Sequence, residues 1–123
     1  MNKYEALHRF YSSFGIRAYE ENSVPDDIKA DDMPYLTYDV LTSPFDVQNT
    51  ALSCQIFFKS TTLTKINALT EKIYNALDGG AKLQCDTGYI ILYPGTPFAQ
   101  NVTTGDKTVK AKYINISADF IVL

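Results

Sequence analysis

Residues 51–59 read Ala-Leu-Ser-Cys-Gln-Ile-Phe-Phe-Lys, and their apolar side chains recur at every second position. In an extended chain, one side carries Leu52, Cys54, Ile56 and Phe58. The other side carries Ser53, Gln55 and Lys59, and Phe57 is the exception to the alternation. A period of two with one apolar side is typical of an antiparallel strand that packs one face on a core. The stretch therefore predicts a half-buried strand.

The period changes to that of a helix directly after this strand. Thr61 or Thr62 is placed to cap the helix at its start. The apolar stripe of the helix consists of Leu63, Ile66, Leu69, Ile73 and Leu77. The sequence Asp78-Gly79-Gly80 ends it, because glycine readily takes the left-handed conformation common at helix C-termini.

Further strands are expected after this helix. Residues 82–85 and 89–93 have strand character, and a hairpin turn is expected at residues 86–88. Pro94-Gly95-Thr96-Pro97 is expected to break the pattern, and residues 103–107 are rich in turn formers. Residues 109–123 alternate again, and their apolar side consists of Ile114, Ile116, Ala118, Phe120 and Val122.

A helix and another strand are expected before residue 51. Residues 2–14 have Phe10 beside a helical stripe of Tyr4, Leu7, Tyr11 and Phe14, and Gly15 is placed to end this helix. Residues 35–41 alternate, with one side formed by Leu36, Tyr38 and Val40, and Ser43-Pro44 marks a break after them. Residues 16–19 are compatible with a short extended piece.

A long acidic loop is expected between the first helix and the first full strand. It covers residues 20–33 and contains Glu20, Glu21, Asp26, Asp27, Asp31 and Asp32. Loops of this length inside a small domain are usually functional or mobile.

These elements follow one another in the order α-β-β-α-β-β. One antiparallel or mixed sheet of four to five strands, with two helices packed on one face, would bury every apolar stripe named above. The sequence therefore predicts an α+β fold in a single domain that covers residues 1–123. We see no internal repeat and no interdomain linker in the sequence.

Composition and charge narrow the classes of function. The chain has 123 residues, of which 46% are hydrophobic and 20% are charged, as in ordinary globular domains. Eleven Lys and Arg against fourteen Asp and Glu give a formal net charge of −3. A mildly acidic chain with no basic run is a poor candidate for binding nucleic-acid backbones. No stretch approaches the roughly 20 apolar residues of a membrane span, so no membrane association is expected.

The start of the chain and the cysteines indicate the expected compartment. Residues 1–10 read as the beginning of an amphipathic helix and not as a signal peptide. Two cysteines, Cys54 and Cys85, do not form a disulfide framework, so an intracellular folding environment with reduced thiols is expected.

The residues that carry chemistry do not form a catalytic motif. His8 is the only histidine, and both cysteines fall in expected strands, with Cys54 on the inward face. The acids of residues 20–33 lack the spacing of a calcium loop, and no glycine-rich phosphate loop is present. We therefore expect no enzyme activity, no cofactor and no metal. A metal-dependent enzyme that uses the acidic loop stays open as an alternative.

Several segments resemble one family of phage proteins. They are residues 10–19 (Phe-Tyr-Ser-Ser-Phe-Gly-Ile-Arg-Ala-Tyr), 23–26, 33–38, 72–80 and 95–100 (Gly-Thr-Pro-Phe-Ala-Gln). Together they resemble small tail-completion proteins of long-tailed phages and prophages of Gram-positive bacteria. These proteins are similar to tail terminators of the lambda kind. The resemblance spans nearly the whole chain, and its motifs are not catalytic signatures.

The resemblance implies a virion structural protein in the tail or neck, assembled in the host cytoplasm. Its subunits would form a homo-hexameric ring that caps the tail tube and joins it to the head connector. The implied partners are the major tail tube protein and the connector or neck proteins. DNA would pass through the lumen without specific binding, which a negative subunit favours by repelling phosphates. A monomer before assembly stays open.

A ring needs two different surfaces on each subunit. Nine Tyr and seven Phe supply side chains that suit interfaces. We expect contacts from the loops at residues 20–33 and 94–100, with the candidates Asp26, Asp27, Asp31, Asp32, Tyr35, Pro97, Phe98 and Gln100. Phe98 as an anchor tucked under the sheet is the competing interpretation. A head-completion or neck protein and a host adaptor with a Tyr-rich face remain alternatives to the terminator.

Overall fold

Three long strands form the centre of one mixed sheet. The computed structural model describes residues 1–39, 42, 44 and 46–122. The helices are α1 (Lys3–Ser12) and α2 (Thr64–Leu77), with short 3-10 turns at Glu21–Ser23 and Ala30–Asp32. The strands are β1 (Arg17–Glu20), β2 (Tyr35–Tyr38), β3 (Val47–Lys59), β4 (Ala81–Gln84), β5 (Gly88–Val102) and β6 (Val109–Val122).

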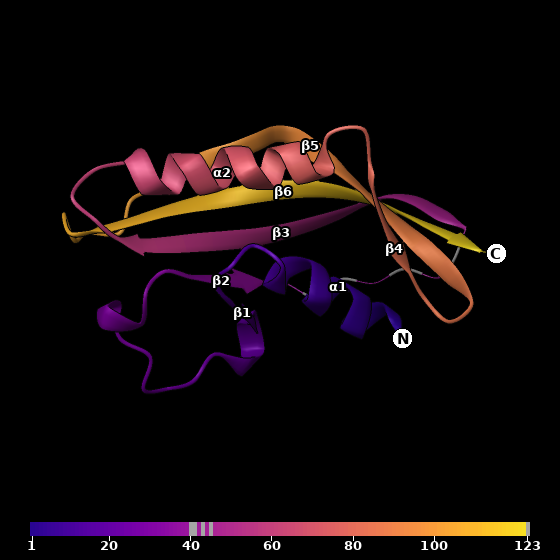
Figure 1. Cartoon of the computed structure of the whole chain (residues 1–123), viewed down its shortest axis with the longest axis horizontal. Helices are drawn as coiled ribbons and strands as arrows, with labels where there is room; N and C mark the ends of the chain where they lie inside the picture. The colour runs from indigo at the N-terminus through magenta and orange to yellow at the C-terminus, as the bar shows by residue number, and fades with distance from the viewer. Residues whose placement is uncertain (40–41, 43, 45, 123) are drawn as a thin grey trace.

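The strands lie in the order β1-β2-β3-β6-β5-β4. The pair β1–β2 is parallel, and the other neighbours are antiparallel. The long strands β3, β6 and β5 are neighbours along the molecule, and β4 pairs with the start of β5 at one end (Figure 1).

The expected sheet of four to five strands with two helices packed on one face is wrong. In the part of the chain that the structure describes, the sheet has six strands and curls into a half-barrel. The helices do not form one layer, because α2 lies against β3, β5 and β6, whereas α1 contacts β1 and β4, the strands at the two ends of the sheet. The curl brings both ends toward α1 (Figure 1).

The expected break at residues 94–97 is also wrong. β5 continues through these residues to Val102, and its pairing with β6 shifts register between Pro94 and Ala99. A bulge of this kind lets a strand accommodate proline, which has no N–H for the ladder. Gly95 fits there because a Cβ would lie 2.8 Å from the backbone of Asn115. Val40 and Ser43 of the expected first strand and its break lie outside the described residues.

The two helices begin differently. The side chain of Asn2 accepts a hydrogen bond from the backbone N–H of Glu5, and the Glu5 carboxylate accepts one from the backbone N–H of Asn2, so α1 starts with a capping box. The expected cap of α2 at Thr61 or Thr62 is wrong, because the residue at the N-cap is Leu63 and makes no side-chain cap bond.

The core lies between the helices and the sheet. Its fully buried side chains include Leu7 and Tyr11 of α1, Ile66, Ile73 and Leu77 of α2, and Ile56, Ile90, Ile114 and Phe120 of the sheet. Tyr4 is 56% exposed, so the buried side of α1 contains Ala6 in place of this expected member of the stripe. Within the described part of the chain, no helix is long and apolar enough to span a membrane.

Candidate functional site

The only histidine is exposed and hydrogen-bonded. Its Nδ1 lies 2.7 Å from the hydroxyl of Tyr38, and its Nε2 lies 3.3 Å from the hydroxyl of Ser12, one turn further along α1. Burial raises the pKa of the Tyr38 hydroxyl, which is therefore neutral at physiological pH. The chain of three side chains ties α1 to β2.

Neither cysteine has the surroundings of a reactive thiol. Cys54 is buried on the inward face of β3, as expected, and this burial raises the pKa of its thiol far above the ordinary value. Cys85 is also buried and follows β4 instead of lying in a strand, and burial raises the pKa of its thiol. A thiol with a raised pKa is a weaker nucleophile at neutral pH because less thiolate is present.

The acidic segment, residues 20–33, is held by local hydrogen bonds. Glu20 accepts bonds from the backbone and side-chain amides of Asn22 and from the hydroxyl of Ser23. Asp32 accepts a bond of 2.7 Å from the backbone N–H of Lys29. These carboxylates therefore stabilise the turns of the acidic segment itself.

One ion pair fastens the acidic segment to the sheet. The Nζ of Lys59, at the end of β3, lies 2.6 Å from Oδ1 of Asp31, and both side chains are largely exposed. Lys59 lowers the pKa of the Asp31 carboxyl. Asp26 and Asp27 are exposed beyond this attachment. Among the described residues, no group of three or more His, Cys, Asp and Glu is arranged to hold a metal ion.

The candidate Tyr35 belongs to a row of aromatic rings beside the acidic segment. The Tyr35 ring stacks on Phe57 of β3 with centroids 5.0 Å apart and meets Tyr19 of β1 edge to face at 6.1 Å. All three side chains are half-buried. They alternate with the core residues of their strands and lie on the outer side of the sheet.

The candidates Pro97, Phe98 and Gln100 lie in β5, on the other side of β3 and β6 from Tyr35. Pro97 is exposed, and its carbonyl accepts a bond of 3.0 Å from the side-chain amide of Asn115. Phe98 is half-buried and meets Tyr74 of α2 edge to face at 5.2 Å. The ring of Phe98 therefore mainly packs against α2, which agrees with the interpretation of Phe98 as an anchor.

The candidate residues thus fall on two separate surfaces. The four aspartates and Tyr35 lie together at the β1–β2 side of the sheet, while Pro97, Phe98 and Gln100 lie on β5. No contact joins the two groups among the interactions of the described residues.

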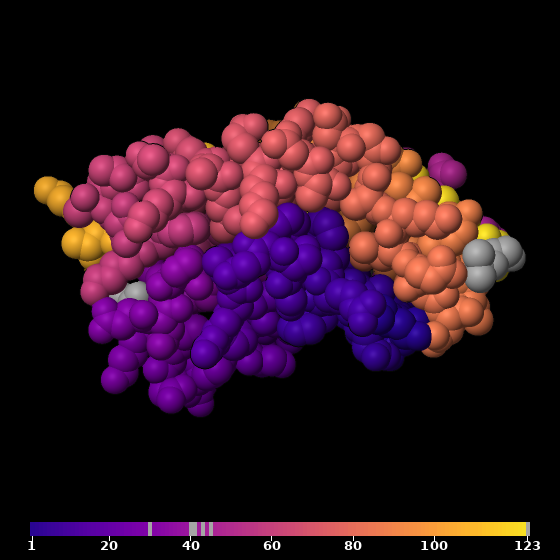
Figure 2. All heavy atoms as spheres, viewed as in Figure 1, coloured from indigo at the N-terminus to yellow at the C-terminus, as the bar shows by residue number. Residues whose placement is uncertain are grey.

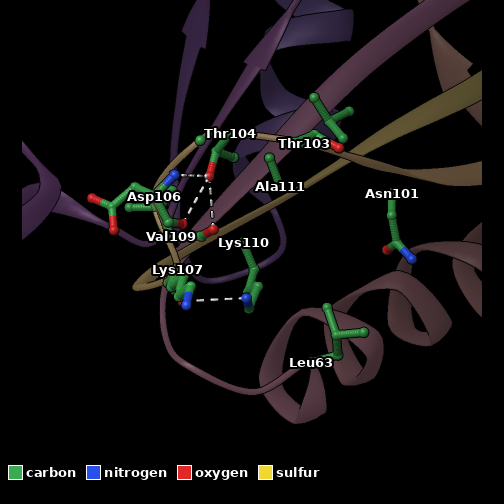
Figure 3. A pocket seen from close by; sticks show the side chains of 11 residues that line it. Leu63, Asn101, Thr103, Thr104, Asp106, Lys107, Val109, Lys110 and Ala111 are labelled. Atoms are coloured by element: carbon green, nitrogen blue, oxygen red, sulfur yellow. Dashed lines mark hydrogen bonds between the residues drawn. The ribbon is translucent and has the colours of Figure 1, made fainter.

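A recess that sequence reasoning did not assemble lies at the turn between β5 and β6. It has a volume of about 460 Å³, and its apolar lining comes from Leu63, Val102, Val109 and Ala111. Lys107 and Lys110 border it together with Asp106, and Leu63 faces them from the start of α2 (Figure 3). Lys107 and Lys110 are close in sequence, but Leu63 joins them only through the fold.

The turn that carries these lysines is rigidly hydrogen-bonded. The hydroxyl of Thr104 donates to the carbonyls of Asp106 and Val109, both at 3.0 Å (Figure 3). Asp106 accepts bonds from the backbone and hydroxyl of Thr108, and these bonds lower the pKa of its carboxyl. These bonds hold the turn that borders the recess.

A second groove lies between α1 and β4. It has a volume of about 590 Å³ and is lined by Ala6 and Phe10, with Arg9 and Lys82 at its border. It sits beside the side of β4 that pairs with no other strand of the described residues.

Comparisons with known proteins give no relative for this chain. No family model, no curated protein and no solved structure matches it.

Proposed function

We propose that the chain is a structural subunit of a long-tailed phage, namely a tail terminator. Its subunits form a hexameric ring that caps the tail tube, stops its growth and joins it to the head connector. The proposal starts from the sequence resemblance of residues 10–19, 33–38, 72–80 and 95–100 to small tail-completion proteins.

One structural observation supports this proposal most directly. The sheet ends in two unlike strands, β1 and β4, and within the described residues each pairs on one side only. β1 leads into the acidic segment, whereas β4 borders the groove that carries Arg9 and Lys82. Two different lateral surfaces are what a head-to-tail contact requires, and such contacts close into rings when the rotation between subunits allows it.

The charge of the chain fits passage of DNA through a ring. The formal net charge of −3 repeats in every subunit, so a ring is negative overall. Like charge keeps DNA from adhering while it moves through the lumen.

The mass of the purified chain in solution tests the proposal. We expect light scattering after gel filtration, over a concentration series, to show a species of about 83 kDa, six times the 13.8 kDa of one chain. A chain that stays monomeric and also fails to bind tail tubes would contradict the proposal.

Three other assignments have distinct tests. A head-completion or neck protein would show the same unlike edges, and gene order between the connector and tail tube genes separates it from a terminator. A metal-dependent enzyme would have to bind a cation through the acidic segment, and calorimetric titration with millimolar Mg²⁺ or Ca²⁺ would detect this. A host adaptor would be absent from purified particles.

A further inference from the structure

The acidic segment and the lysine-bordered recess lie at the same end of the molecule. Figure 2 shows residues 20–33 projecting at the lower corner of this end, with the start of α2 and the turn around residues 103–108 above them. In the sheet, β3 separates the β1–β2 side, which carries the acidic segment, from the β6–β5 side, which carries the recess. The two features therefore lie on different sides of one subunit.

The charges of these two surfaces are opposite. The acidic segment contains six carboxylates and one lysine. The surface around the recess, which we call the lysine surface, contains one carboxylate, that of Asp106, and two lysines, Lys107 and Lys110. A chain that is mildly negative overall thus carries a net positive surface at the recess and a negative acidic segment.

The apolar parts of the two surfaces match as well. Leu63, which is 39% exposed, lines the recess together with Val102 and Ala111. In the acidic segment, Val24 and Ile28 flank Asp26 and Asp27 and are only half-buried. A segment with apolar side chains on either side of two carboxylates suits an apolar recess bordered by ammonium groups.

Contacts within one subunit leave charged groups of both surfaces exposed. The ion pair of the acidic segment connects Asp31 to Lys59, which lies at the end of β3 and does not line the recess. Asp26 and Asp27 are exposed, and Lys107 is exposed at the border of the recess.

We propose that the acidic segment of one copy of this chain docks on the lysine surface of a second copy. Asp26 and Asp27 would lie against Lys107 and Lys110, and Val24 or Ile28 would enter the recess. Each subunit then donates a segment on one side and receives one on the other. This inference rests on the proposed ring and names the contact that builds it.

DNA is the competing occupant of the lysine surface. Against it, the recess is largely apolar, and Asp106 stays ionised because Thr108 hydrogen-bonds its carboxyl and holds its pKa low. A phosphate backbone would meet that negative charge, whereas a protein segment can place its apolar side chains there.

Two charge-reversal variants test the contact in the full chain. The first is Lys107→Glu with Lys110→Glu, and the second is Asp26→Lys with Asp27→Lys. Each variant alone brings like charges together at every interface, so we expect the concentration needed for half-assembly to rise about tenfold or more. Mass by light scattering over a concentration series at low salt measures this.

A mixture of the two variants is the decisive sample. In the mixture, the glutamates that replace Lys107 and Lys110 in one variant face the lysines that replace Asp26 and Asp27 in the other. At the next interface, the native lysines of the second variant face the native aspartates of the first, so both pairings are favourable. We expect the equimolar mixture to recover wild-type assembly in rings that alternate between the two variants. This rescue cannot come from a folding defect, because misfolded variants would not restore each other.

A matched control changes the same number of charges elsewhere. Glu71→Lys with Asp78→Lys reverses two exposed carboxylates of α2 and its end, away from both proposed surfaces. We expect this control variant to assemble as the wild-type chain does.

Three results would overturn the proposed contact. They are wild-type assembly by each reversed variant alone, loss of assembly without rescue in the mixture, and a wild-type chain that is monomeric at about 1 mM and low salt. A lysine-reversed variant that assembles normally but loses binding to a DNA duplex would assign the surface to DNA. None of these results removes the terminator proposal, which is decided separately by the growth of tail tubes.

Discussion

Tyr11 and Tyr38 form a stacked pair in the core, with ring centroids 4.5 Å apart, but only one of their hydroxyls is hydrogen-bonded. The hydroxyl of Tyr38 reaches His8. The hydroxyl of Tyr11 is buried and has no hydrogen-bond partner among the described residues. A buried hydroxyl without a partner costs free energy, because it has lost its bonds to water.

This difference gives the first prediction. We expect Tyr11→Phe to raise the free energy of unfolding by about 1 kcal/mol, because it removes an unsatisfied polar atom and keeps the ring. The matched change Tyr38→Phe removes a satisfied hydroxyl and is expected to lower the free energy of unfolding by about 1 kcal/mol. Urea denaturation of the two variants measures both. Destabilisation by Tyr11→Phe would mean that its hydroxyl does have a partner.

The ion pair of Asp31 with Lys59 gives a prediction on pH. The Lys59 ammonium favours the carboxylate, so the pKa of Asp31 lies below its ordinary value of 3.8. The ion pair is therefore present at neutral pH and is lost only as the pH falls through that lowered pKa. We expect Lys59→Gln to raise the pKa of the Asp31 carboxyl toward its ordinary value, as measured by NMR titration. An unchanged pKa would show that the pair does not form in solution.

At the scale of single elements, the bulge of β5 is the feature that sequence patterns missed. Pro94-Gly95-Thr96-Pro97 has the composition of a loop, and local turn signals do not report that β6 lies beside it. The strand continues because pairing with β6 resumes at Ala99 after the register shift. The four-residue strands β1 and β4 also form through long-range pairing. They are too short for their sequences to show a clear period of two.

The bulge carries a prediction of its own. We expect Gly95→Ala to lower the free energy of unfolding by about 1–3 kcal/mol, because the added Cβ meets the backbone of Asn115. Gln100→Ala, an exposed change in the same strand, is expected to stay within about 0.5 kcal/mol of wild type. Thermal denaturation compares them. Equal stabilities would show that the two strands separate easily at the bulge.

The structure gives Phe98 a packing role, whereas the sequence made it a candidate for an interface contact. Its ring packs on Tyr74 of α2, so we expect Phe98→Ala to lower the free energy of unfolding by about 1–2 kcal/mol, less than for a fully buried phenylalanine. Assembly lost in this variant would therefore reflect stability as well as contact. Tyr35→Ala and Gln100→Ala, with melting curves as controls, probe the two candidate surfaces separately. If both variants assemble fully, Tyr35 and Gln100 do not contribute to the interface.

At the scale of the whole molecule, the sequence predicted most of the elements but not their arrangement. The alternation of residues 51–59 and the stripe of Ile66, Leu69, Ile73 and Leu77 identify β3 and the buried side of α2. Periodicity does not state how far a sheet curls, nor that α1 touches strands at both of its ends. The lysine surface was missed for the same reason, since Leu63 is distant in sequence from Lys107 and Lys110.

The growth of tail tubes tests the terminator proposal most directly. The sample is the major tail tube protein that the proposal names as partner, assembled with and without the purified chain and imaged by electron microscopy. We expect added chain to place a ring at one end of each tube and to stop elongation there. Tubes that grow to the same lengths, with no added density at either end, would contradict the proposal.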